Sequence, residues 1–110
     1  MLIWEIITRP KGLSRQPAQQ ALVDATCRNL VLYQFKTCPF CLKVRQEIAR
    51  LSLTIERRDA QHNVINREEL IQSIGRAKVP CLKITDTAGN VQWLLDSKAI
   101  VAYLQNHFAS

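Results

Sequence analysis

Two cysteines separated by two residues, Cys38 and Cys41, are the residues in this sequence best suited to carry out chemistry. They lie between an apolar run at 30–35 and a run at 42–51 whose apolar residues recur at helical spacing. A cysteine at the start of a helix lies near free backbone N–H groups and the positive end of the helix dipole, which favour the thiolate over the thiol. Because the thiolate is the form that attacks disulfides, the pair predicts redox chemistry, with Cys38 as the nucleophile and Cys41 as the resolving thiol.

A strand should precede the thiol pair and a helix should follow it. Residues 30–35 are branched, aromatic or otherwise apolar, which is typical of a short buried strand. Residues 39–51 predict a helix, because Pro39 suits the first turn and the apolar residues after it keep helical spacing. The apolar side of this helix consists of Val44, Ile48 and Leu51. The outer side carries Lys43, Arg45, Gln46 and Arg50.

The remaining elements follow from apolar spacing and turn residues. Strands are predicted over 54–58, 81–85 and 91–94, and helices over 67–74 and 95–108. Asn66 followed by Glu69 forms a capping-box pattern at the start of the first of these helices, and Gly75 ends it.

The first part of the chain is predicted to be an extension rather than a second domain. Its boundaries are 1–28, with a single domain over 29–110, and structure-breaking residues interrupt it before Ala18. These breaks are Pro10, Gly12 and Pro17. A short helix is expected over 18–30, with Ala21, Leu22 and Ala25 on one side.

The segments 32–41, 78–82 and 95–104, in this order of elements, resemble a dithiol glutaredoxin of the thioredoxin-fold superfamily. The resemblance implies an α/β, thioredoxin-like fold with a central four-stranded mixed sheet flanked by helices, preceded by the N-terminal extension. Residues 92–95 stand where many glutaredoxins carry a Gly-Gly pair. In this feature the chain is closer to the N-terminal domain of glutathione transferases.

By resemblance, the protein is a glutathione-dependent oxidoreductase that reduces protein disulfides and protein–glutathione mixed disulfides. Glutathione is then a co-substrate, and disulfide-bonded or glutathionylated proteins are the partners. The residues implied to bind glutathione are Lys36, Phe40, Arg76, Val79, Pro80, Asp96 and Ser97.

Most of these residues also have a purely structural interpretation, and both interpretations remain open at this point. Pro80 is a cis proline by resemblance, with the Val79 backbone pairing with substrate, whereas an ordinary X-Pro bond is trans. Asp96 and Ser97 either hold the γ-glutamyl end of glutathione or simply cap the last helix. The three cations Lys36, Arg76 and Lys78 either hold a carboxylate of glutathione or are solvated.

The other two cysteines are ambiguous. Cys81 is either a third redox thiol or a buried strand cysteine, and Cys27 is open in the same way. No metal site is expected, because Cys27, Cys81, His62 and His107 include no second close pair of ligands.

Composition limits the partners and the compartment. The formal net charge of +6 is spread along the chain without an aromatic platform, so no nucleic-acid partner is expected. The chain opens without a signal peptide, and its four cysteines are too few for a disulfide scaffold, which favours a reducing cytoplasm.

We expect a monomer. Residues 1–7 are too short to span a membrane, so membrane association is expected only if they end a longer anchor.

Two other functions stay open from the sequence. One is a glutaredoxin that carries a [2Fe–2S] cluster between two subunits. The other is a transferase-like or ligand-binding thioredoxin-fold module, since residues 33–41 also resemble the corresponding segment of the membrane-associated prostaglandin E synthases. Because the sequence ends at Ser110, we expect it to lack the all-helical second domain of such proteins.

Overall fold

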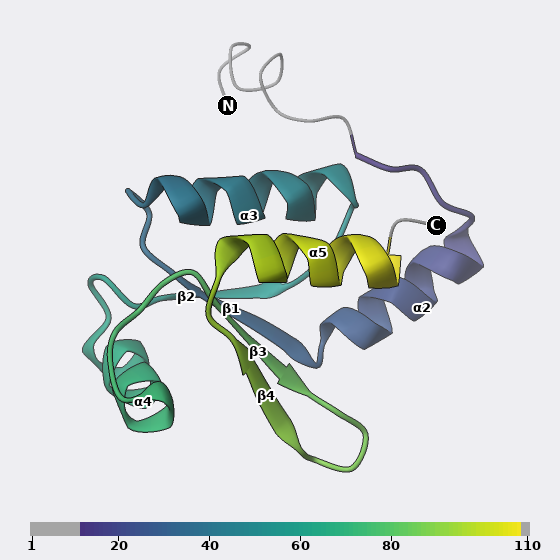
Figure 1. The fold of residues 1–110 in the computed structure, drawn as a ribbon. Helices are drawn as coiled ribbons and strands as arrows, with labels where there is room; N and C mark the ends of the chain where they lie inside the picture. Colours follow the sequence, from purple (N-terminus) through teal and green to yellow (C-terminus); the bar gives the residue numbers. More distant parts are fainter. Residues whose placement is uncertain (1–11, 109–110) are drawn as a thin grey trace.

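The computed structural model describes residues 12–108 (Figure 1). Residues 1–7, discussed above as a possible end of an anchor, lie outside this range. The elements are α2 (Pro17–Cys27), β1 (Leu30–Gln34), α3 (Pro39–Arg50), β2 (Glu56–Asp59), α4 (Val64–Ile74), β3 (Cys81–Thr85), β4 (Val91–Leu94) and α5 (Ser97–Phe108). None of the helices within residues 12–108 is long and apolar enough to cross a membrane.

The strands form the predicted four-stranded mixed sheet, in the order β2-β1-β3-β4. β1 pairs in parallel with β2, while β3 is antiparallel to both β1 and β4. The register places Tyr33 of β1 opposite Cys81 of β3. Because β1 is central and pairs on both sides, the connection that follows it leaves from the middle of the sheet.

The two faces of the sheet are covered by different helices. Figure 1 shows α3 and α5 over one face, with their first turns at the same end, and α4 on the other side. Side chains alternate along β1. Leu32 therefore packs in the same cluster as Val44 of α3 and Leu104 of α5, whereas Tyr33 packs with Leu70 of α4.

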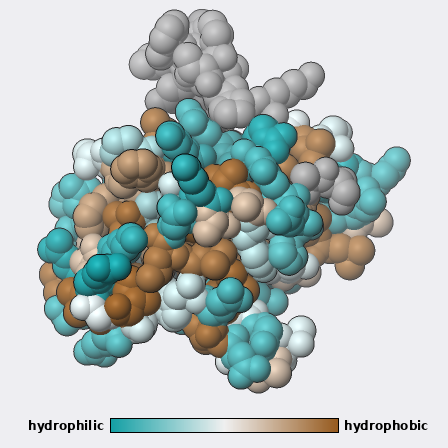
Figure 2. Space-filling model, viewed as in Figure 1, coloured by the Kyte–Doolittle hydropathy of each residue, from teal (hydrophilic) through white to brown (hydrophobic). Residues whose placement is uncertain are grey.

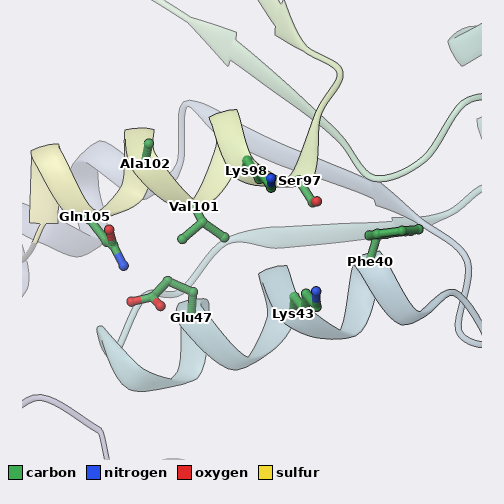
Figure 3. Close-up of a pocket in the computed structure, with 8 residues that line it drawn as sticks. All are labelled: Phe40, Lys43, Glu47, Ser97, Lys98, Val101, Ala102 and Gln105. Carbon is green, nitrogen blue, oxygen red and sulfur yellow. The ribbon is translucent and has the colours of Figure 1, made fainter.

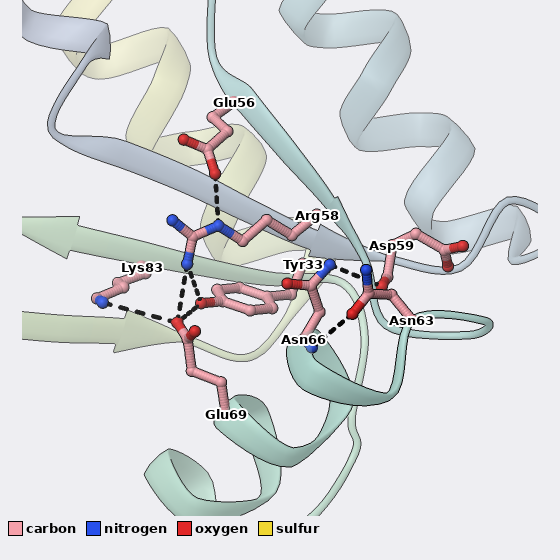
Figure 4. A network of polar contacts seen from close by, with 8 residues as sticks. All are labelled: Tyr33, Glu56, Arg58, Asp59, Asn63, Asn66, Glu69 and Lys83. Carbon is pink, nitrogen blue, oxygen red and sulfur yellow. Dashed lines mark hydrogen bonds and ion pairs between the residues drawn. The ribbon is translucent and has the colours of Figure 1, made fainter.

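A polar network ties α4 to the sheet (Figure 4). Glu69 of α4 accepts hydrogen bonds from the Tyr33 hydroxyl and from Arg58 of β2, and its carboxylate lies 3.9 Å from the Lys83 amine of β3. Burial, together with the Glu69 carboxylate beside it, raises the pKa of Tyr33 to about 12. The hydroxyl therefore stays protonated at neutral pH and can donate to Glu69.

The start of α4 differs from the sequence prediction. The helix begins at Val64, and its cap is Asn63, whose side chain accepts a hydrogen bond from the Asn66 N–H at 3.0 Å. The predicted cap, Asn66, instead donates to the Asp59 carbonyl, and Glu69 takes part in the network above. Asn63 and Asn66 are both suitable caps. Because Asn66 donates to the Asp59 carbonyl of β2, Asn63 becomes the cap.

The buried side of α2 also differs from the prediction. Cys27 is fully buried in the main core and Val23 packs against the same core, while Leu22 is 71% exposed. Ala21 and Ala25 are exposed as well. Because β1 begins soon after the end of α2, the last turn of the helix is forced onto the core, and this sets the side that is buried.

Residues 12–15 lie along the C-terminal end of α3. The Leu13 N–H donates to the Arg50 carbonyl at 2.8 Å, and the Ser52 hydroxyl donates to the Leu13 carbonyl at 2.7 Å. Arg15 donates to the carbonyl oxygens of Leu51 and Phe108, at 2.7 and 2.5 Å. These two oxygens are helix-end acceptors without an intrahelical partner, so one guanidinium joins the ends of α3 and α5. The part of the extension that the structure describes is therefore packed on the domain.

We predict that Arg15→Gln lowers the free energy of unfolding by about 1–3 kcal/mol, the usual cost of leaving partly buried acceptors unpaired. Arg67→Gln, which removes the same charge from an exposed position on α4, is the matched control. Urea unfolding followed by circular dichroism measures both. Equal unfolding midpoints for the two variants would contradict the role given to Arg15.

Candidate redox-active site

The first cysteine of the pair lies at the junction between β1 and α3, as the sequence predicts. The Cys38 N–H donates to the Phe35 carbonyl at 3.3 Å, which closes a tight turn after the strand. Cys38 has an extended backbone and is the N-cap residue of α3, and Pro39 occupies the first helical position. Pro39 needs no hydrogen-bond acceptor there, and its fixed φ already suits the helix.

The environment of Cys38 favours its thiolate. Partial burial alone raises its pKa, but the N–H groups of Phe40 and Cys41, the Cys41 thiol and the Arg45 charge act in the opposite direction and prevail. The net result is a pKa below the usual value of cysteine. Free N–H groups at a helix start are the physical source of this effect. Cys38 is half-buried, the least buried of the four cysteines.

The second cysteine of the pair has the opposite tendency. Cys41 is fully buried. Burial, together with the neighbouring Cys38 sulfur, raises its pKa above the usual value. The two pKa values therefore lie on opposite sides of the usual cysteine value, so that the thiolate is favoured at Cys38 and the protonated thiol at Cys41.

The remaining cysteines are buried thiols. Cys81 is fully buried in the cluster beneath α4, with Tyr33 and Leu70, and burial raises its pKa to about 12. Cys27 lies in the main core, and burial raises its pKa also. All four cysteines of the chain are free thiols in the structure. Of the two interpretations of Cys81, the geometry favours the buried strand cysteine, because it packs on the face covered by α4 rather than by α3.

The Val79–Pro80 peptide bond is cis, as the resemblance implied. The antiparallel register of β1 and β3 pairs Tyr33 with Cys81, so the residues just before Cys81 continue past the end of β1. Val79 and Pro80 therefore lie at the sheet end from which the turn to Cys38 leaves. Pro80 is buried and Val79 is half-buried.

A groove of about 380 Å³ runs between α3 and α5, and Phe40 and Ser97 lie at one end of it (Figure 3). It is lined by Phe40, Lys43, Glu47, Ser97, Lys98, Val101, Ala102 and Gln105. Phe40 lies within the Cys38–Cys41 tetrad and Ser97 is the first residue of α5, so the two helix starts share one end of the groove. Phe40 is 55% exposed, and Figure 2 shows apolar residues at the surface among hydrophilic ones on this face.

Only some of the predicted glutathione-binding residues line the groove. Phe40 and Ser97 line the groove. The side chains that carry charge, Lys36, Arg76 and Asp96, are exposed and are not among the residues that line it. Among the described residues, no group of three or more His, Cys, Asp or Glu residues is placed to hold a metal ion.

Sequence reasoning missed Arg45, which it placed on the outer side of the helix. Its guanidinium instead turns back to the end of β1 and donates to the Gln34 side chain at 2.8 Å. The signal that could have found it is Gln34 itself, a polar residue in an otherwise apolar strand. Such a residue needs a hydrogen-bonding partner once the strand is buried.

Comparison with known proteins gives matches of three kinds. Over 107 residues the chain is 34% identical to prostaglandin E synthase 2 of Mus musculus, a match that covers 97% of this chain and 26% of the relative. A glutathione transferase homologue from Drosophila mojavensis, solved with bound glutathione, superposes with a TM-score of 0.60 at 26% identity, over 74% of this chain and 36% of that protein. Glutaredoxin C1 of Populus tremula x tremuloides superposes with a TM-score of 0.55 at 17% identity, over 83% of this chain and 88% of that protein.

The glutaredoxin superposition confirms the thioredoxin-like fold. The chain spans about a quarter of the length of the mouse relative that it matches. The sequence model of the glutaredoxin family matches residues 30–88, more than half of the chain, and this segment contains β1, both cysteines of the pair and the cis proline. The chain therefore belongs to the glutaredoxin family.

Proposed function

We propose that this protein is a glutathione-dependent thiol–disulfide oxidoreductase that uses Cys38 as nucleophile and Cys41 as resolving thiol. The observation that carries the proposal is the placement of the two thiols at one helix start: Cys38 is the half-buried N-cap residue of α3, and Cys41, in the first turn, is fully buried. The pKa of Cys38 is lowered and that of Cys41 is raised as a consequence of this placement. A thiolate attacks disulfides, whereas a neighbouring protonated thiol does not react until a mixed disulfide has formed beside it.

In the proposed reaction with a glutathionylated protein, the Cys38 thiolate attacks the glutathione sulfur of the mixed disulfide. A Cys38–glutathione disulfide forms, and the substrate cysteine leaves as a thiolate that takes up a proton. The thiolate of a second glutathione then attacks the glutathione sulfur bound to Cys38. Oxidised glutathione leaves, and the Cys38 thiolate is restored.

Protein disulfides require the second cysteine. Cys38 attacks one sulfur of the substrate, which gives a mixed disulfide and one free substrate thiol. Cys41 loses its proton and attacks the Cys38 sulfur, so that the second substrate thiol leaves and a Cys38–Cys41 disulfide remains. Two glutathiones then reduce this disulfide and are themselves oxidised to one glutathione disulfide.

We assign the glutathione site to the same end of the fold. The Val79 backbone, ahead of the cis proline, pairs with the peptide backbone of glutathione, and the start of α5 at Asp96 and Ser97 receives its γ-glutamyl end. Lys36 and Arg76 attract its carboxylates from their exposed positions, and Phe40 packs against it. The glutathione bound to the Drosophila mojavensis homologue supports glutathione as the ligand.

A second candidate function is supported by the identity with prostaglandin E synthase 2 across nearly the whole chain. In that case the chain is the thioredoxin-fold part of a larger synthase, and the Cys38 thiolate acts on a small molecule rather than on a protein. Formation of prostaglandin E by a protein that lacks turnover of glutathionylated peptide would favour this candidate over the first.

The test is the glutathione-dependent reduction of a glutathionylated peptide, coupled to glutathione reductase. We predict that Cys38→Ser abolishes turnover, whereas Cys41→Ser retains it because the monothiol reaction needs only Cys38. Cys81→Ser, which removes a buried thiol that has no part in the reaction, is the control and should retain activity. Activity in Cys38→Ser, or none in the wild type, would refute the proposal.

The lowered pKa of Cys38 also predicts a pH dependence. Alkylation by iodoacetamide requires the thiolate, so the rate at Cys38 should rise with pH and level off above its pKa, with a midpoint below that of a cysteine peptide, about 8.5. Cys41→Ala should move this midpoint upward, because it removes the thiol that donates a hydrogen bond to the Cys38 thiolate. A midpoint at or above that of the peptide in the wild type would contradict the account.

A further inference from the structure

The last residue of β1 is a buried polar residue with two fixed contacts. Gln34 is only 8% exposed, although it ends a strand of apolar residues. Its backbone carbonyl accepts a hydrogen bond from the Ala60 N–H at 3.0 Å, and its side-chain oxygen accepts one from Arg45 at 2.8 Å. A buried amide of this kind is costly unless it is paired, so Arg45 is the partner that Gln34 requires.

Arg45 makes a second contact beyond the strand. The other terminal nitrogen of its guanidinium donates to the Lys36 carbonyl at 3.3 Å, in the turn that ends at Cys38. The guanidinium is a rigid fork, so one side chain of α3 bridges the end of β1 and the turn. The same turn is closed by the Cys38 N–H on the Phe35 carbonyl. Arg45 thus fixes the turn from one side while the start of α3 fixes it from the other.

The position of the Arg45 charge is also suited to a thiolate. Arg45 lies on α3 about two turns after Cys38. A guanidinium is permanently charged, and this charge helps to lower the pKa of Cys38. Other charged groups on this side are the exposed Lys36, Lys43 of α3 and Lys98 of α5 on the groove, and Asp59 of β2, which pairs with Gln34.

We propose that Arg45 is a positioning residue of the redox site: by bridging Gln34 and the Lys36 carbonyl, it holds the turn that presents Cys38 to the start of α3. The inference rests on the proposed function only in taking Cys38 as the reactive thiol. Without the bridge, the turn is free to move away from the helix start, and the N–H groups that stabilise the thiolate lose their alignment with the sulfur.

The experiment measures the pH profile of Cys38 alkylation by iodoacetamide, followed by peptide mass spectrometry, so that neither glutathione nor a protein substrate is needed. We expect Arg45→Gln to raise the midpoint and to slow alkylation at pH 7 by about three- to tenfold, since one pKa unit changes the thiolate fraction about tenfold. Arg45→Lys keeps the charge without the fork and should lie between Arg45→Gln and the wild type.

The matched control is Arg50→Gln, which removes the same charge from the same helix. Arg50 pairs with Glu47 at the other end of α3, so the midpoint of this variant should equal that of the wild type. The positioning role is overturned if Arg45→Gln keeps the wild-type midpoint, if Arg50→Gln raises it equally, or if Arg45→Lys has the full wild-type midpoint. If thermal unfolding shows that Arg45→Gln does not fold, the comparison of the Arg45→Lys midpoint with the wild-type midpoint tests the positioning role by itself.

Failure of this inference is distinguishable from failure of the proposed function. If the wild type lacks turnover but Arg45→Gln shifts the alkylation midpoint and Arg45→Lys lies between Arg45→Gln and the wild type, the proposed function is wrong and the positioning role stands. If the wild type reduces the glutathionylated peptide and Arg45→Gln leaves the alkylation midpoint unchanged, the positioning role is wrong and the proposed function stands.

Discussion

A negatively charged sulfur in a partly buried position must be stabilised by nearby polar hydrogens, and the redox site depends on this constraint. Cys38 meets it at the N-cap of α3, where the N–H groups of Phe40 and Cys41 favour the thiolate. The same helix start buries Cys41, and burial keeps that thiol protonated. One local geometry therefore makes two cysteines three positions apart chemically different.

The rest of the fold keeps this helix start in place. β1 is paired on both sides, so its end, and the turn after it, are anchored in the centre of the sheet. α5 lies beside α3 with its first turn at the same end, which brings Ser97 to the groove that begins at Phe40. At the far end of both helices, Arg15 joins their last carbonyl groups. The Glu69 network attaches α4 to the opposite face, away from the thiols.

The elements that depend on local sequence signals could be predicted. β3 and β4 have the predicted bounds, Gly75 ends α4 in a left-handed conformation, and the cis proline follows from the resemblance. The errors occur where a tertiary contact decides between local alternatives. The cap of α4 is Asn63 rather than Asn66, and α2 buries Cys27 rather than Leu22. Arg45 was missed for the same reason, because a helix pattern does not show that a side chain turns back to the preceding strand.

The central claim is that Cys38 accepts the glutathionyl group, and the most direct measurement is the mass and position of the adduct. Reduced Cys41→Ser protein would be incubated with a glutathionylated peptide, digested without reductant and mapped by mass spectrometry. We expect one glutathione per chain, carried on Cys38, with Cys27 and Cys81 unmodified because both are buried. Glutathione on Cys81 or Cys27 in place of Cys38, or no adduct on a folded protein, would contradict it.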